Sequence, residues 1–389
     1  MKLKKKALRM LPCWKAQCPT EMKKPCQLRP NPPLRFGLNI HGYFLSEIGL
    51  GESVRLLSAA ADTQNFPTGL INRELKGRQN TDVFKDRLST PKSVKASLSV
   101  LGINEVKNLR KDICTRQHNI IYPFWELEKL PSKIKESCNE FDSFWAPSKF
   151  IFDCLQAELS APVHLVKQPV DVPATNPLPA VNGGSLKFLT YFDFDSFAAR
   201  KNPEGAVLAF QAAFPRERSD VRLTVKTRGQ RDHGRRAWLA EQAQKDPRIT
   251  ILDKTISEAE MTTLMLDHHA FISLHRSEGF GLGCAEALLA GRSVICTDYG
   301  GTRDFINEET GFPVEWRYLA LKDGDYVGWE NARWADPSIE QAASRLQEIY
   351  DQPEKAKQKT LNGVDLLRRE HSFGAIGKVI TRTLAASGL

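Results

Sequence analysis

Short apolar runs alternate with stretches of helical period along most of the chain. Runs of β-branched and aromatic residues are typical of buried strands, and apolar residues repeating every three to four positions are typical of helices. This pattern predicts strands at residues 36–40, 119–122, 143–146, 163–166, 186–192, 221–226, 249–252, 270–274 and 293–296. It predicts helices at residues 52–60, 149–158, 204–214 and 284–289. Because strands that alternate with helices form parallel sheets joined by crossovers, we expect an α/β fold.

The pattern is interrupted once, between residues 168 and 184, where four prolines and two glycines stand among few large side chains. A chain of 389 residues is also too long for a single compact core. We therefore expect two Rossmann-like domains that face each other across a cleft. The predicted division is residues 35–170, a linker at 171–184, residues 185–368, and a C-terminal helix at 369–389 that crosses back to the first domain.

The positive charge of the chain is confined to its beginning. Residues 1–35 hold ten lysines and arginines and one acidic residue, Glu21. The net charge of this segment, +9, equals that of the whole chain. The remaining residues are balanced, with 45 basic and 45 acidic side chains. This balance argues against a nucleic-acid partner, because nucleic-acid-binding proteins carry their basic patch on a folded face.

The basic tail, residues 1–34, has two interpretations that the sequence leaves open. Leu3, Met10, Leu11 and Trp14 recur at helical spacing between basic residues, as in helices that lie on anionic membranes. The alternative is a solvated leader. We expect a cytoplasmic protein, in peripheral contact with the cytoplasmic membrane face under the first interpretation. The eight scattered cysteines have no zinc-binding spacing and are expected to be free thiols.

Candidate chemistry is concentrated in the segment His275–Gly291, which reads HRSEGFGLGCAEALLAG. A predicted strand ends at Leu274, a loop with three glycines follows, and a helix begins after it. Glycines allow the backbone to approach a ligand closely, and the free N–H groups at a helix start attract anions. Glu278 lies before this phosphate-binding loop and Glu286 follows it. Two carboxylates around a phosphate loop suit a ligand with sugar hydroxyls on both sides of a phosphate, namely a nucleotide sugar.

The spacing Glu278-x7-Glu286, inside SEGFGLGCAEALLAGRSVICTDYGGTRDFI, resembles the motif of the retaining glycosyltransferase family four, the glycosyl transferases group 1. Further segments extend the resemblance. Pro169–Asp171 is similar to the strand end that closes the family's first domain, and Arg200–Pro203 is similar to the start of a lysine-bearing helix. Tyr122–Pro131 resembles a segment of one branch of polysaccharide and lipopolysaccharide sugar transferases. The resemblance implies the glycosyltransferase B fold, which consists of two Rossmann-like domains.

The resemblance also implies roles for individual residues. Glu286 is expected to accept hydrogen bonds from the ribose, Glu278 to hold the donor sugar as the catalytic carboxylate, and Lys201 to neutralise the diphosphate. The other donor-binding candidates share positions in or near the glycine loops or carry positive charge: they are Gly279, Phe280, Gly281, Leu282, Gly42, Arg200 and Lys226. No metal and no other cofactor is expected, since cations of the protein can stabilise the leaving diphosphate.

The sequence departs from the family at the end of the second domain's first strand. Phe192-Asp193 stands where the family has Gly-Arg, so the second diphosphate cation must come from elsewhere. Arg200 and Lys226 are the candidates. The pair Asp193 and Asp195 imitates a metal-binding Asp-x-Asp, but it lies in the wrong domain and loop for that role and is interpreted as a solvated turn.

Three residues of the first domain are candidates for contact with the acceptor: Trp125, Glu126 and His41. An aromatic face and a carboxylate beside a sugar site can stack on and orient a saccharide. The alternatives are structural roles: Trp125 caps the core, and His41, like His118, is structural.

We therefore expect retaining transfer of a hexose, with mannose as the first guess, from a nucleotide diphosphate sugar. The acceptor would be a glycan or a lipid-linked saccharide of polysaccharide or lipopolysaccharide biosynthesis. The alternatives are a nucleotide-sugar epimerase of the same fold and a non-catalytic sugar-binding scaffold protein.

Overall fold

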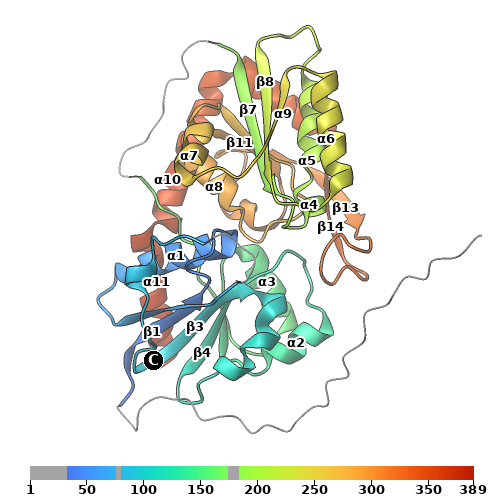
Figure 1. The fold of residues 1–389 in the computed structure, drawn as a ribbon. Coiled ribbons are helices and arrows are strands. Elements are labelled where there is room, and N and C mark those ends of the chain that lie inside the picture. The colour runs from blue at the N-terminus through green and yellow to red at the C-terminus, as the bar shows by residue number, and fades with distance from the viewer. Residues whose placement is uncertain (1–32, 76–79, 174–183) are drawn as a thin grey trace, which may run out of the picture.

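The protein contains two six-stranded sheets, which lie in separate halves of the molecule (Figure 1). The computed structural model describes residues 33–75, 80–173 and 184–389. The first sheet has the order β2-β1-β3-β4-β5-β6 and contains β1 (Arg35–Gly42), β2 (Thr68–Asn72), β3 (Val94–Gly102), β4 (His118–Phe124), β5 (Ser143–Ala146) and β6 (Val163–Leu165). The second has the order β12-β11-β10-β7-β8-β9 and contains β7 (Leu186–Asp193), β8 (Val221–Arg228), β9 (Ile249–Asp253), β10 (Ala270–Ser273), β11 (Ser293–Thr297) and β12 (Phe312–Val314).

All neighbouring strands in both sheets are parallel. The predicted α/β class with two Rossmann-like halves is therefore confirmed. Each predicted strand and helix is present, although several are longer than predicted. The strands β2, β3 and β12 were not predicted.

Helices cover both faces of each sheet (Figure 1). The first sheet lies between α1 (Gly49–Asp62) and α11 (Phe373–Ala386) on one face and α2 (Ser132–Cys138) and α3 (Lys149–Glu158) on the other, with the 3-10 helix η2 (Ile103–Asp112) beside α2. The second lies between α5 (Pro203–Ala213), α6 (His233–Lys245) and α9 (Ile339–Asp351) on one face and α7 (Glu258–Leu266), α8 (Leu282–Leu289) and α10 (Pro353–His371) on the other. Short helical turns complete the chain: α4 (Ala198–Lys201), η1 (Lys85–Arg87) and η3 (Gly300–Asp304).

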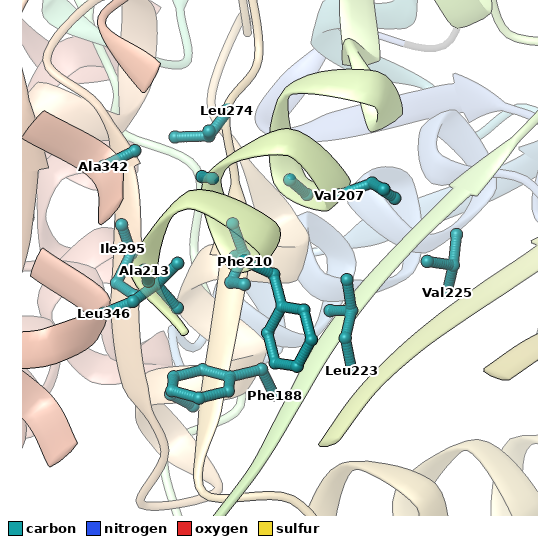
Figure 2. Close-up of a cluster of buried hydrophobic side chains, with 14 of the residues drawn as sticks. Phe188, Val207, Phe210, Ala213, Leu223, Val225, Leu274, Ile295, Ala342 and Leu346 are labelled. Atoms are coloured by element: carbon teal, nitrogen blue, oxygen red, sulfur yellow. The ribbon is translucent and has the colours of Figure 1, made fainter. Parts of the chain in front are cut away.

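One core of the second half is shown in Figure 2. Phe188 of β7 and Leu223 of β8 point from the sheet toward Phe210 of α5, and all three side chains are fully buried. The Phe210 ring also lies 5.6 Å from the ring of Phe214. Burial of these apolar surfaces is what holds the helices on the sheet.

The C-terminal helix α11 packs on the first half of the molecule. Ile376, Ile380 and Leu384 share a buried core with Val54 and Leu57 of α1. The two helices approach closely at Gly377, where a Cβ atom would lie 2.5 Å from the carbonyl oxygen of Ala60. The residue boundaries predicted for the domains stay predictions, and the basic tail and most of the predicted linker lie outside the described residues.

An antiparallel hairpin, β13 (Trp316–Ala320) and β14 (Arg333–Pro337), was not predicted from the sequence. The segment between its strands reaches the first half, where the Tyr326 ring lies 5.5 Å from the ring of Trp125. Both halves are thus joined by the hairpin as well as by α11. In the described part of the chain, no helix is long and apolar enough to span a bilayer.

The core of Figure 2 gives a first prediction. Phe210→Ala should lower the free energy of unfolding by about 3–5 kcal/mol, since it leaves a cavity among well-packed side chains. Leu208→Ala, on the same helix but 43 % exposed, is the control and should change it by less than about 0.5 kcal/mol. Urea unfolding followed by circular dichroism measures both. Equal effects of the two substitutions would contradict the packing described.

Candidate functional site

The second sheet reverses its strand order between β7 and β10. Strands β7, β8 and β9 follow one another in one direction from this point, and β10, β11 and β12 follow in the other. Ligands of open α/β sheets bind at such a switch point, outside the carboxyl ends of the strands. Here β7 leads to Lys201 at the end of α4, and β10 leads to the loop with Glu278. The two sequence candidates are therefore brought together by the topology.

The glycines of this loop, Gly279 and Gly281, pack backbone against backbone with a second glycine segment, Gly300 and Gly301. Gly281, the N-cap of α8, has a φ of +94°, and Gly300 has a φ of +83°, both in the left-handed region that favours glycine. A Cβ atom at Gly301 would lie 2.1 Å from the carbonyl oxygen of Gly279. The Gly301 amide donates to the carbonyl oxygen of Glu278 at 2.8 Å. The second glycine pair thus supports the loop that carries Glu278.

Glu278 is 8 % exposed and is held by two cations. Its Oε2 atom lies 3.0 Å from Nη1 of Arg200, and its Oε1 atom accepts from Nζ of Lys201. Burial alone would raise the pKa of the Glu278 carboxyl, but the charges of Arg200 and Lys201 outweigh it and hold the pKa well below its usual range. Glu278 is therefore a carboxylate at neutral pH.

Arg200 connects Glu278 to the first half of the molecule. Its Nη1 atom also donates to the carbonyl oxygen of Ser277 at 2.9 Å, and its Nη2 atom lies 3.9 Å from Oε1 of Glu126. The hydroxyl of Tyr326, from the hairpin segment, donates to Glu126. Arg200 is 7 % exposed, so its guanidinium is committed to these partners. Glu126, which the sequence suggested as an acceptor residue, thus lies beside the guanidinium that holds Glu278.

Glu286 lies in the second turn of α8 and stays exposed. The hydroxyl of Tyr191, on β7, donates to its Oε2 atom at 2.7 Å. Desolvation by the surrounding protein raises the pKa of Glu286, and the charges of Glu52 and Glu258 add to the rise, which the bond from Tyr191 opposes. A Cβ atom at Gly283 would lie 2.5 Å from the Tyr191 hydroxyl, so only glycine lets this tyrosine reach Glu286.

Lys226 and Arg228 lie on one face of β8, beside β7. The parallel register pairs Tyr191 with Lys226 and Asp193 with Arg228. Nε of Arg228 donates to Oδ2 of Asp193 at 3.0 Å, and Nη2 donates to the carbonyl oxygen of Glu47 in the first half at 3.1 Å. Arg228 was not among the residues predicted from the sequence, because the predicted strand ended at Lys226. The alternation along a longer strand would have placed both cations on the same face.

The loop of Glu278 also contacts the first half directly. The Ser148 hydroxyl, at the N-cap of α3, donates to the carbonyl oxygen of Gly279 at 2.6 Å. One residue later, the Lys149 amide donates to Oδ2 of Asp304 at 2.9 Å. These bonds fix the start of α3 against both glycine segments.

Several predicted residues have other environments. Trp125 is 1 % exposed and donates to the carbonyl oxygen of Lys129 at 3.0 Å, so its ring faces are covered by the core. The buried Trp125 ring is therefore not available to a saccharide. His41 is half-buried and lines a small pocket with Ser97 and Ser99 of β3, and its predicted role stays a prediction.

The candidates in and near the glycine loops also have different environments. Phe280 is 2 % exposed and packs on Phe305, with ring centres 5.1 Å apart, so its side chain lies in the core and only its backbone contributes to the loop. Leu282 is half-buried at the start of α8. Gly42 has a packing role, because a Cβ atom there would lie 2.6 Å from Cγ2 of Val54. Asp195, of the Asp-x-Asp pair, accepts from the amide of Gln230 at 3.2 Å.

Comparison with known proteins places this site in context. Residues 196–321, which contain Lys201, Arg228, Glu278 and Glu286, match the family model of the glycosyl transferases group 1. No curated protein matches the sequence.

Solved structures of similar fold span nearly the whole chain. A sucrose-phosphate synthase from Thermosynechococcus elongatus is 15% identical, with a TM-score of 0.66 over 91% of this chain and 100% of that one. HepE from Anabaena, in complex with UDP-glucose, is 13% identical, with a TM-score of 0.63 over 90% of this chain and 100% of that one. These likenesses concern the fold. Together with the family match, they show that the chain has the glycosyltransferase B fold and that residues 196–321 are similar to the glycosyl transferases group 1.

Proposed function

We propose that the protein transfers a hexose from a nucleoside diphosphate sugar to a saccharide hydroxyl, with retention of the anomeric configuration. The observation that carries this proposal is the pair of carboxylates at the strand-order switch point, with Lys201 bound to Glu278 and Tyr191 bound to Glu286. Two similar structures support it, since HepE is described with UDP-glucose and an Escherichia coli protein of 10% identity with UDP-2-fluoro glucose.

The donor contacts follow from the chemistry of each side chain. Glu286 is exposed, and its carboxylate accepts hydrogen bonds from the ribose hydroxyls. Glu278 holds hydroxyls of the transferred sugar. Lys201, which has 27% of its side chain exposed, turns from Glu278 to the diphosphate. Arg200 acts through Glu278, because its guanidinium is buried on the carboxylate and on the Ser277 carbonyl.

Arg228 supplies the second diphosphate cation in this proposal. The family's arginine would stand at the end of β7, where this chain has Asp193. Arg228 reaches that position from the neighbouring strand, because its guanidinium is bound to Asp193 and has 31% of its side chain exposed. An arginine at this point can bind a phosphate oxygen with two parallel N–H groups.

The reaction then needs no acid or base beyond the substrates. The acceptor oxygen bonds to the anomeric carbon while the bond from that carbon to the diphosphate oxygen breaks. The diphosphate takes the acceptor's proton on the same face, which retains the configuration. Lys201 and Arg228 stabilise the negative charge that builds on the leaving diphosphate, so we expect no metal requirement.

The acceptor is proposed as a glycan or lipid-linked saccharide of polysaccharide or lipopolysaccharide biosynthesis, and mannose is the first sugar to test. The choice of mannose rests on the segment Tyr122–Pro131, and the lipid-linked acceptor rests on the basic tail, residues 1–34, together with the family resemblance. The proposal of peripheral contact with an anionic membrane rests on residues 1–34 alone. Trp125 is left out of the acceptor site, because its side chain is buried in the core, whereas the half-buried His41 stays a candidate.

Substitution of the two glutamates should change different kinetic constants. Glu286→Ala should raise the KM for the nucleotide sugar about ten- to hundredfold, since it removes charge-assisted hydrogen bonds to the bound donor. Glu278→Ala should lower kcat by a similar factor or more, since it frees the transferred sugar at the reacting carbon. Steady-state transfer from UDP- and GDP-hexoses measures both, with the exposed Glu309→Ala as the control. Wild-type rates in both variants would refute the assignment.

Arg228 can be tested against a neighbouring arginine. Arg228→Ala should reduce kcat/KM about ten- to hundredfold, because one of the two cations on the leaving group is lost. Arg231→Ala, with 75% of its side chain exposed, is the matched control and should change kcat/KM by less than about twofold. If the two substitutions act alike, the second cation is not Arg228.

A further inference from the structure

Lys226 is a buried lysine at the carboxyl end of β8 that the donor contacts above do not use. It is 7 % exposed and forms no hydrogen bond or ion pair with any residue in the described part of the chain. Its ammonium nitrogen is nevertheless not fully sealed from solvent. A nearly buried ammonium without a partner costs free energy, so it points to a ligand that supplies an acceptor.

The strand register fixes where Lys226 lies relative to the two glutamates. Tyr191, which holds Glu286, is the direct neighbour of Lys226 across the β7–β8 pair. Glu278 follows β10, on the other side of β7. Along the edge of the sheet the order is therefore Glu278, then Glu286 with Tyr191, then Lys226.

The parts of a nucleoside diphosphate sugar follow one another in the order sugar, diphosphate, ribose and base. This order matches the order of the residues along the sheet edge, a step that rests on the proposed function. With the sugar at Glu278 and the ribose at Glu286, the base extends over β8. Lys226 is then on the base side of the ribose, whereas Arg228, two residues nearer the strand end, is bonded back to Asp193 of β7.

Two neighbouring features describe the surroundings of Lys226. On the same face of β8, the Thr224 hydroxyl is hydrogen-bonded to Nε2 of His268 at 2.8 Å. Glu258, in the first turn of α7, is near enough to Glu286 to contribute to its raised pKa. The start of α7 thus lies on the same side as the ribose contact.

We infer that Lys226 reads the nucleobase and selects a base with a carbonyl oxygen on the edge away from the ribose. An ammonium group only donates hydrogen bonds. Uracil and guanine have a carbonyl oxygen on that edge, at O4 and O6, and can accept from it. Cytosine and adenine have an amino group there, which would face the ammonium donor to donor. This assignment replaces the role of second diphosphate cation that the sequence suggested for Lys226.

Desolvation and the nearby charge of Arg228 lower the pKa of Lys226. An unoccupied site therefore favours the ammonium less than water does. A carbonyl oxygen stabilises the charged form without adding a negative charge beside Asp193.

The test is equilibrium binding of UDP, GDP, CDP, ADP and inorganic pyrophosphate to the full chain by isothermal titration calorimetry. The wild type should bind UDP or GDP at least about tenfold more tightly than CDP and ADP, the effect of one charge-assisted hydrogen bond. Lys226→Met should reduce this preference to within about twofold and leave pyrophosphate binding unchanged. Lys226→Gln, whose amide both donates and accepts, should bind CDP or ADP better than the wild type does. Lys254→Met, at an exposed position just after β9, is the control and should keep the wild-type preference.

Each other outcome has a definite meaning. A wild type without preference for the carbonyl bases overturns the inference, whether or not the variants fold. Equal weakening of all four nucleotides and of pyrophosphate in Lys226→Met returns Lys226 to the diphosphate, and the proposed function stands. A wild type that binds none of the nucleoside diphosphates contradicts the proposed function itself.

Discussion

The buried cluster of Arg200, Lys201 and Glu278 is the interaction on which the site depends. It joins the helical turn after β7 to the loop after β10, so it spans the point where the strand order of the second sheet reverses. Ion pairs of this kind cost desolvation, and here the cost is offset by two cations and by the bond from Arg200 to the Ser277 carbonyl. Removing Glu278 would leave the buried guanidinium of Arg200 without its nearest carboxylate partner. The glutamate is therefore held in one orientation before any ligand arrives.

The same cluster is connected to the first half of the molecule. Arg200 lies near Glu126, which is held by Tyr326 of the hairpin segment, and Ser148 binds the backbone of the Glu278 loop. A shift of one sheet relative to the other would therefore disturb the position of the Glu278 carboxylate. In enzymes that close over their substrates, such contacts couple the position of the acceptor to the chemistry. The helix α11, packed on α1, adds a second connection at the far side of the molecule.

The sequence predicted the elements that carry the motif, because their signals are local. Buried strands read as apolar runs, and the spacing of Glu278 and Glu286 around three glycines marked the site. The strand β3 was missed, since Ser97 and Ser99 interrupt its apolar run although its neighbours on both sides bury it. The hairpin β13–β14 was missed because its strands are short and mixed in polarity, and it is stabilised by contacts with the distant residues 125–131.

The sequence could not reveal which side chains meet across strands. Arg228, which we propose as the second diphosphate cation, comes from a neighbouring strand, and only the register of β7 and β8 places it beside Asp193. Likewise, the sequence left open whether Trp125 has a free ring face or caps the core, and the ring of Tyr326 from the hairpin segment packs beside it. Lengths and periods of elements are local properties, whereas these pairings depend on tertiary structure.

The most direct measurement is a crystal structure of the full chain with a bound nucleoside diphosphate. Our account predicts the ribose hydroxyls about 3 Å from the Glu286 carboxylate and the diphosphate between Lys201 and Arg228. It also predicts the base over β8, beside Tyr191. A nucleotide bound in the opposite direction, with its ribose at Glu278, or bound away from the carboxyl ends of β7 and β10, would contradict it.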